Sequence, residues 1–253
     1  MYAIPVEISK ESSRGLAWAV LRLFVFSMDK EITALKAQKK NPNRISVFLD
    51  GEYAFGLARI VAAWLHIGQH LSEQEIERLK QLDTAEVAYL KALRLLSYRT
   101  RSEAEIQRKL TEHGFAQSVV EATVQRLKDN NILGDPKFAQ EWIENRSAFR
   151  PRSKRMLASE LRQKGVDEEV IEQALAETDD EQILAYQSAS KYARRLAGMD
   201  WETFRKRLGE HLSRRGFSYG TIVPVLRQVW DETHSADDGS DPTPNEDESE
   251  YEN

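Results

Sequence analysis

The chain has 253 residues, of which 41% are hydrophobic and 30% charged, a balance typical of a soluble protein with a large surface. It contains no cysteine, which excludes disulfide bonds and thiolate metal sites and fits a cytoplasmic protein. The formal net charge of −5 is unevenly placed. Ten of the 41 acidic residues lie between Asp231 and Asn253, where there is no Lys or Arg, so the rest of the chain has 36 basic and 31 acidic residues.

The N-terminal segment 15–27, "GLAWAVLRLFVFS", is apolar but too short to span a bilayer, and Arg22 interrupts it. It also lacks the small-residue cleavage site of a signal peptide. We predict that Met28 is the working start of the protein and that residues 1–27 are a non-native or disordered extension. The alternative is a helix that packs on the body of the protein.

Residues 28–83 are predicted to form an N-terminal module with a β-hairpin at 45–57, "ISVFLDGEYAFGL". Asp50-Gly51 lies between alternating apolar residues, and this dipeptide suits the positive φ that both central turn positions require. A helix over "ARIVAAWLHI" is expected next, ending at Gly68. Ser72 and Glu75 have the spacing of a capping box, which predicts a further helix start.

One helix ending recurs at a fixed interval in the next 150 residues. "LTEHGF" (110–115), "LRQKGV" (161–166) and "LSRRGF" (212–217) are spaced 51 residues apart. In each copy, apolar residues at i and i+4 define a buried face, and the glycine supplies the left-handed residue that ends the helix. Ser102 and Ser153 are predicted to cap the helices of the first two copies.

A further helix precedes each copy, from near Thr84 to Tyr98, from a cap at Asp135-Pro136, and from Asp180 to Leu196. The period therefore predicts nine helices in three three-helix repeats, at residues 84–133, 134–178 and 179–231. The fold class is all-α, with the repeats stacked in an elongated, curved array after the small N-terminal module. Residues 232–253 lack aliphatic content and are predicted to be a disordered acidic tail, either solubilising or a mimic of nucleic acid or of an acidic partner.

Motifs of catalysis are missing from the sequence. There is no Walker loop, no dinucleotide-binding glycine fingerprint and no nucleophile elbow. His66 and His70 have the spacing of a metal pair, but Glu73 is the one carboxylate near them. We therefore predict a protein that is not an enzyme and that has no metal and no cofactor.

Positive charge is the most informative feature of the second and third repeats. Arg152, Lys154 and Arg155 lie at a predicted helix N-terminus, where the helix dipole makes cations unfavourable, and a similar group recurs in the third repeat. This pattern favours an anionic partner, with general solubility as the alternative. The predicted binding residues are Arg150, Arg152, Lys154, Arg155, Arg162, Arg205, Lys206 and Arg207. Arg152, Arg155 and Arg162 are expected to share an exposed helix face. Replacing Arg152, Lys154 and Arg155 removes positive charge from a helix N-terminus, so it should leave the fold unharmed or slightly stabilised.

The segment 133–175 resembles the RecX family of bacterial recombinase regulators. The resemblance rests on the order of motifs: Asp135, Phe138 and Trp142, then Pro151 before a basic helix, then "ELRQKGV" and an acidic cap. The flanking copies and the hairpin extend it to about residues 30–230, and residues 1–27 and the acidic tail fall outside it.

The resemblance implies a protein that binds the RecA filament on single-stranded DNA, lies in its groove, and inhibits its ATPase, strand-exchange and coprotease activities. From the repeat architecture we expect an elongated monomer. It also implies a role in recombination, DNA repair and the SOS response, and members of the family have been linked to DNA itself. Two other functions stay open: a direct DNA-binding protein, and a helical scaffold for an unrelated protein partner.

Overall fold

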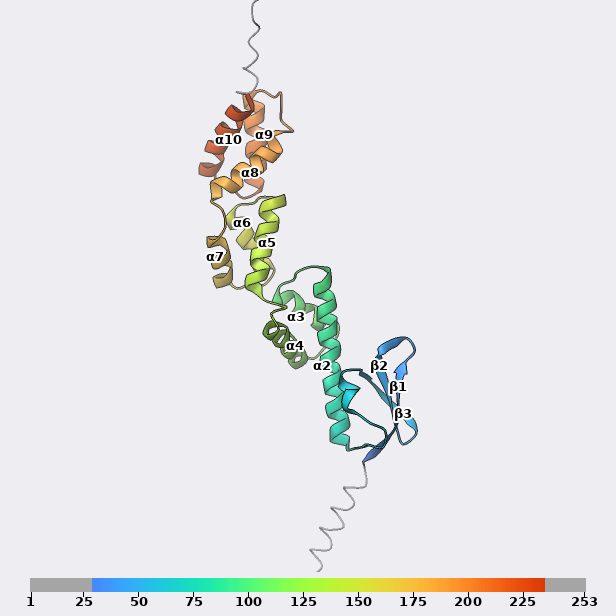
Figure 1. Ribbon diagram of the computed structural model, residues 1–253. Helices are drawn as coiled ribbons and strands as arrows, with labels where there is room; N and C mark the ends of the chain where they lie inside the picture. The colour runs from blue at the N-terminus through green and yellow to red at the C-terminus, as the bar shows by residue number, and fades with distance from the viewer. Residues whose placement is uncertain (1–28, 235–253) are drawn as a thin grey trace, which may run out of the picture. The chain divides into compact units, whose positions relative to one another are not determined.

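The computed structural model describes residues 29–234, so the predictions for the N-terminal extension and for most of the acidic tail lie outside the described residues. Between Lys30 and His234 it contains four β-strands and the nine α-helices that the sequence predicts. These form two compact units, described in turn (Figure 1). The first comprises residues up to Tyr98 together with 110–126, and the second comprises 99–109 and the residues from Leu127 onwards. Within 29–234, no helix has the length and apolar character needed to cross a membrane.

The first unit begins with a four-stranded antiparallel sheet in the order β3-β2-β1-β4. The strands are β1 (Lys30–Gln38), β2 (Asn41–Leu49), β3 (Glu52–Ala58) and β4 (His70–Leu71). The predicted hairpin is confirmed as β2–β3, because Leu49 pairs with Glu52 and both loop residues have positive φ, 51° at Asp50 and 88° at Gly51. Strands β1 and β4 were not predicted.

The predicted helix over "ARIVAAWLHI" is wrong. Ala58 completes β3, and only the short 3₁₀ helix η2 (Val61–Trp64) forms in this segment. The backbone that follows pairs with β1 instead: Gly68 N donates to Ile32 O at 2.8 Å, and Ile32 N donates to Gln69 O at 2.8 Å. Pairing with a strand from earlier in the chain thus overrides the local preference for helix.

Helix α2 (Glu73–Tyr98) begins at the predicted capping box, where Ser72 N donates to the Glu75 carboxylate at 2.8 Å. It then continues through the predicted boundary at Asp83, so a separate helix does not start near Thr84. The reason is tertiary. The Asp83 carboxylate accepts hydrogen bonds from Ala58 N at 2.6 Å and from Arg44 at 2.8 Å, and so joins the middle of α2 to the sheet.

Helices α3 (Glu103–Glu112) and α4 (Gln117–Asp129) follow, and α4 lies largely in the first unit. There Arg126 forms an ion pair with Glu86 of α2 at 2.8 Å, and its guanidinium lies 3.8 Å from the centre of the Tyr89 ring. These contacts hold α4 against α2.

The second unit contains the second and third repeats. The second repeat consists of α5 (Asp135–Phe149), α6 (Lys154–Gln163) and α7 (Glu168–Ala176), and the third of α8 (Glu181–Ala193), α9 (Trp201–Arg214) and α10 (Tyr219–His234). The predicted i, i+4 residues form their cores: Leu157 and Leu161 in the second repeat, and Phe204, Leu208 and Leu212 in the third, are all buried.

The 51-residue period describes the backbone of the helix endings as well as the sequence. Gly114, Gly165 and Gly216 all have positive φ, between 78° and 88°. In each copy the glycine N donates three residues back, at 2.9 Å, and the following N donates five residues back, at 3.2–3.3 Å. This is the Schellman motif formed three times.

The helix starts agree with the sequence less closely. Ser153 caps α6 as predicted, and Ser102 caps α3. Asp135 does not cap α5, because Gly134 is the capping residue and the Asp135 carboxylate accepts a hydrogen bond from Glu103 N at 2.9 Å. At the other end of the unit, α10 continues to His234 and passes the predicted tail boundary at residue 232.

Candidate partner-binding surface

The second unit contains two junctions between repeats, both built from a helix start and a glycine turn. At the first, Ser102 Oγ donates to Lys164 O at 2.6 Å, and a Cβ on Gly165 would lie 2.5 Å from the Ala104 Cβ. At the second, Ser153 N donates to Arg215 O at 3.1 Å, and a Cβ on Gly216 would lie 2.5 Å from Ser153 Oγ. Each serine is fully buried. The N-terminus of each middle helix therefore sits on the glycine turn of the next repeat.

A buried carboxylate strengthens the first junction. Glu105 is 4% exposed, and it accepts hydrogen bonds from Arg99 at 3.0 Å and from Lys164 at 2.8 Å. Burial by itself raises the pKa of this carboxyl, but the bonds and charges of the two cations outweigh burial and lower the pKa to about 2. Glu105 is therefore ionised throughout the neutral range.

Two of the eight predicted binding residues stabilise the fold. Arg152 precedes α6 and forms an ion pair with Glu160 of that helix. Glu160 also pairs with Arg146 at 2.8 Å. Lys154 Nζ donates to the carbonyl oxygens of Leu175 and Thr178, both at 3.1 Å, at the C-terminal end of α7. The prediction that Arg152 shares an exposed helix face with Arg155 and Arg162 is thus wrong.

Six of the predicted residues are exposed. Arg162 forms an exposed ion pair with Glu168, whereas within residues 29–234 the side chains of Arg150 and Arg155 have no ion-pair partner. In the third repeat the exposed residues lie on α9: Arg205, Lys206 and Arg207.

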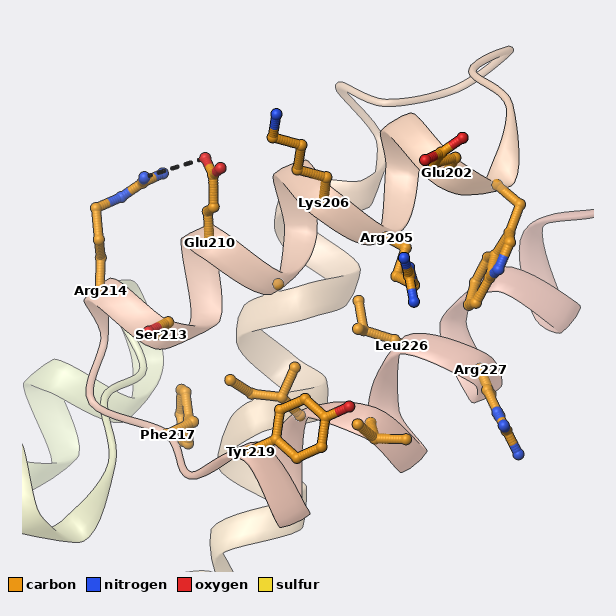
Figure 2. Close-up of a pocket in the computed structure, with 14 residues that line it drawn as sticks. Glu202, Arg205, Lys206, Glu210, Ser213, Arg214, Phe217, Tyr219, Leu226 and Arg227 are labelled. Carbon is orange, nitrogen blue, oxygen red and sulfur yellow. Dashed lines mark ion pairs between the residues drawn. The ribbon is translucent and has the colours of Figure 1, made fainter.

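Arg205 and Lys206 line a groove of about 770 Å³ between α9 and α10 (Figure 2). Apolar side chains of Phe217 and Leu226 line its inside, and Tyr219 is 81% exposed beside them. Arg207 does not line this groove, and its guanidinium lies 3.7 Å from Met199 Sδ. The groove thus combines an apolar surface with a charged rim that includes Glu202, Glu210, Arg214 and Arg227.

Arg150 and Arg152 lie together with cations that the sequence did not single out as binding residues. A hollow of about 280 Å³ is lined by Arg150, Arg152, His211, Arg214 and Arg215. Arg215 directly precedes Gly216 at the end of α9, where a cation complements the negative end of the helix dipole. The period showed that it ends a helix, but it gave no sign that the ends of other helices lie beside it.

Comparison with known proteins assigns the chain to a family. Residues 24–72 match the regulatory protein RecX N-terminal domain, residues 88–127 the first RecX three-helix domain, and residues 135–175 the second. Regulatory protein RecX of Bacillus licheniformis is 31% identical over 214 residues, which cover 83% of this chain and 80% of the relative. The chain belongs to the RecX family. Its relatives of that name are regulatory proteins, and the one from Bacillus subtilis is 29% identical over 202 residues.

Solved RecX structures have the same architecture. A crystal structure of regulatory protein RecX superposes with a TM-score of 0.62 at 27% identity and covers 79% of this chain and 99% of its own. The RecX structure from Lactobacillus salivarius, 22% identical with a TM-score of 0.51, shares the fold over 58% of this chain. Within the described part of this RecX-family chain, no three His, Asp or Glu side chains are grouped so that they could hold a metal ion.

Proposed function

We propose that this RecX-family protein regulates the RecA recombinase by binding its filament on single-stranded DNA and suppressing its ATPase, strand-exchange and coprotease activities. The observation that carries the proposal is the exposure of six of the eight predicted cations along the second and third repeats. Arg155, Arg205, Lys206 and Arg207 form no ion pair with a carboxylate within residues 29–234. A nucleoprotein filament is an anionic partner, and complementary charge speeds association and fixes register.

The groove between α9 and α10 supports a protein partner besides nucleic acid. Its exposed Tyr219 and its apolar inside, next to Arg205 and Arg227, have the composition of a protein-binding surface, in which aromatic and arginine side chains are enriched. A surface used for bare DNA alone would need the cations but not the apolar groove.

RecA-dependent ATP hydrolysis on single-stranded DNA tests the proposal. Adding the protein should slow hydrolysis, and the double variant Arg155→Glu/Arg207→Glu should inhibit severalfold less because it repels the filament. Lys137→Glu is the matched control, since Lys137 is an exposed lysine of the second repeat outside the predicted set. Hydrolysis that is unchanged by the wild-type protein would contradict the proposal, and so would equal inhibition by the double variant and the control.

A further inference from the structure

Three helix ends meet at the junction between the second and third repeats. Helix α5 ends at Phe149, α8 at Ala193 and α9 at Arg214, and residues from all three line two adjoining hollows of about 280 and 360 Å³. We call these hollows together the junction pocket. Its charged side chains are Arg150, Arg152, Lys191, Arg195, Arg214 and Arg215.

The lining of the junction pocket includes no carboxylate among the described residues. Glu160 pairs with Arg152 from outside the lining and is shared with Arg146, and Glu210 lies 3.7 Å from Arg214. Arg150 and Arg195 have no ion pair within residues 29–234, and both are exposed. The pocket therefore holds more positive charge than the neighbouring carboxylates compensate.

Helix dipoles explain only part of this charge. Each helix C-terminus acts as about half a negative charge, so the three ends together supply about −1.5. With the two neighbouring carboxylates this still leaves about two and a half of the six positive charges uncompensated. An excess of this size is enough to balance the charge of one phosphate group, about −1.5 to −2 for a monoester near neutral pH.

Hydrogen bonds beside His211 hold the Arg215 guanidinium in one orientation. Arg215 Nε donates to His211 Nε2 at 2.8 Å, and Arg215 Nη1 donates to Pro151 O at 3.1 Å. The His211 ring stacks on Tyr192 with ring centres 3.9 Å apart. Burial, followed by the charges of Arg215, Arg214 and Arg195, lowers the pKa of His211 to about 4, so the ring stays neutral and keeps accepting from Arg215. These bonds fix the guanidinium, and within residues 29–234 its Nη2 donates no hydrogen bond.

We propose that the junction pocket is a binding site for a phosphate group, held by Arg150, Arg195 and Arg215. Guanidinium groups match the oxygens of a phosphate with paired N–H donors, which makes arginine the usual residue for planar recognition of this ion. The phosphate belongs either to the backbone of a nucleic acid or to a small phosphate compound. Because Arg150 comes from the second repeat and Arg195 and Arg215 from the third, the bound phosphate also braces the junction between them.

Two measurements on the full chain test the site with different sources of phosphate. The first is the melting temperature in inorganic phosphate against sodium chloride of equal ionic strength, since a ligand that binds the folded state alone raises it. The second is the fluorescence anisotropy of a labelled oligothymidylate. The variants are Arg150→Gln and Arg195→Gln, whose exposed side chains form no ion pair within residues 29–234. The matched control is Lys137→Gln, which removes one positive charge from an exposed side chain of the second repeat outside the pocket.

Stabilisation of wild type and control by phosphate, reduced in both pocket variants, supports the site with free phosphate as a sufficient ligand. Oligonucleotide binding that weakens about fivefold or more in the pocket variants alone, with a salt dependence reduced by about one counterion, supports the site with a phosphodiester as its ligand. If neither probe distinguishes the pocket variants from the control, the proposal is overturned. Neither measurement contains RecA, so the result is independent of the proposed regulatory function.

Discussion

Gly165 and Gly216 meet two requirements at the same residue. Both have positive φ, and both lie so close to the preceding repeat that an added Cβ would be 2.5 Å from a neighbouring atom. Gly114 has the same φ, near 84°, but nothing lies within 4 Å of its added Cβ. Comparison of the three equivalent glycines therefore distinguishes the cost of the left-handed backbone from the cost of close packing between repeats.

We expect Gly114→Ala to lower the free energy of unfolding by about 1–2 kcal/mol, the cost of the left-handed conformation. Gly165→Ala and Gly216→Ala should cost a further 1–3 kcal/mol or so, because the methyl group overpacks the junction. Gly209→Ala is the control: Gly209 is inside α9 with room for a Cβ at 3.9 Å, so alanine should stabilise the protein by up to about 1 kcal/mol. Urea denaturation measures all four, and equal losses at the three turn glycines would contradict the packing at the junctions.

Glu105 gives the first junction a dependence on pH. Its pKa is about 2 in the folded protein, below the value of 4.5 expected without these contacts, so its ionised form stabilises the fold above pH 4.5. That contribution, about 3 kcal/mol at this shift, is lost as the pH falls from 4.5 towards 2.

Glu105→Gln should therefore unfold more easily than wild type at pH 7 and should lose less stability between pH 4.5 and 2. Denaturant unfolding at several pH values measures the difference. Glu103→Gln is a suitable control, because Glu103 pairs with Lys128 at a more exposed site on the same helix. A wild-type protein and a Glu105→Gln variant with parallel pH profiles would show that the ion pairs do not contribute.

At the scale of elements, the sequence correctly predicted the features that depend on residues close together along the chain. The glycine endings, the buried i, i+4 residues and the caps at Ser72 and Ser153 depend on residues within one turn, and these predictions were confirmed. The errors involve residues whose partners are distant in sequence. Asp83 ends the predicted N-terminal module but binds the sheet from within α2, and "ARIVAAWLHI" is apolar enough for a helix but pairs with β1.

The same distinction applies to the predicted binding residues. Positive charge at the start of α6 indicated a surface for an anionic partner, yet the sequence could not show that Lys154 reaches the carbonyl oxygens that end α7 or that Arg152 reaches Glu160. The junction pocket was missed for the opposite reason. Its cations lie at or just beyond the ends of α5, α8 and α9, and only the packing of the repeats brings them together.

Lys154 and Arg155 are neighbours on α6 with opposite expected effects. Lys154→Ala removes two hydrogen bonds from a charged group to the end of α7, so it should lower the free energy of unfolding by about 1–2 kcal/mol. Arg155→Ala should stay within about 0.5 kcal/mol of wild type, because its side chain is exposed and unpaired within residues 29–234. Under the proposed function, Arg155→Ala should nevertheless weaken inhibition of RecA, most clearly at low salt. Chemical denaturation and the ATPase assay on both variants check this, and a destabilised Arg155→Ala would place that side chain among the structural cations.

For the whole molecule, the elongated, monomeric array predicted from the 51-residue period stays a prediction, which solution scattering tests.

The distribution of charge raises a second question at this scale. The chain has net charge −5 because of its C-terminal acids, while the rest has an excess of Lys and Arg. Residues 235–253 contain eight acidic residues and no basic ones, and they follow α10 directly. Glu232 belongs to the folded part, since its carboxylate accepts a hydrogen bond from Tyr186 at 2.6 Å.

A chain that ends at His234 should therefore melt at nearly the same temperature as the full chain. If the acidic segment competes with anionic partners for the exposed cations, the shortened chain should bind the RecA filament more tightly at low salt. The difference should shrink towards physiological ionic strength, because the screening length falls from about 30 Å at 0.01 M to about 8 Å at 0.15 M. A full-length chain with the eight acids replaced by Asn or Gln is the control that separates charge from chain length, and it should behave like the shortened protein. Equal binding by all three chains at low salt would leave the segment a solubilising role, and a large drop in melting temperature on truncation would show that it contributes to the fold.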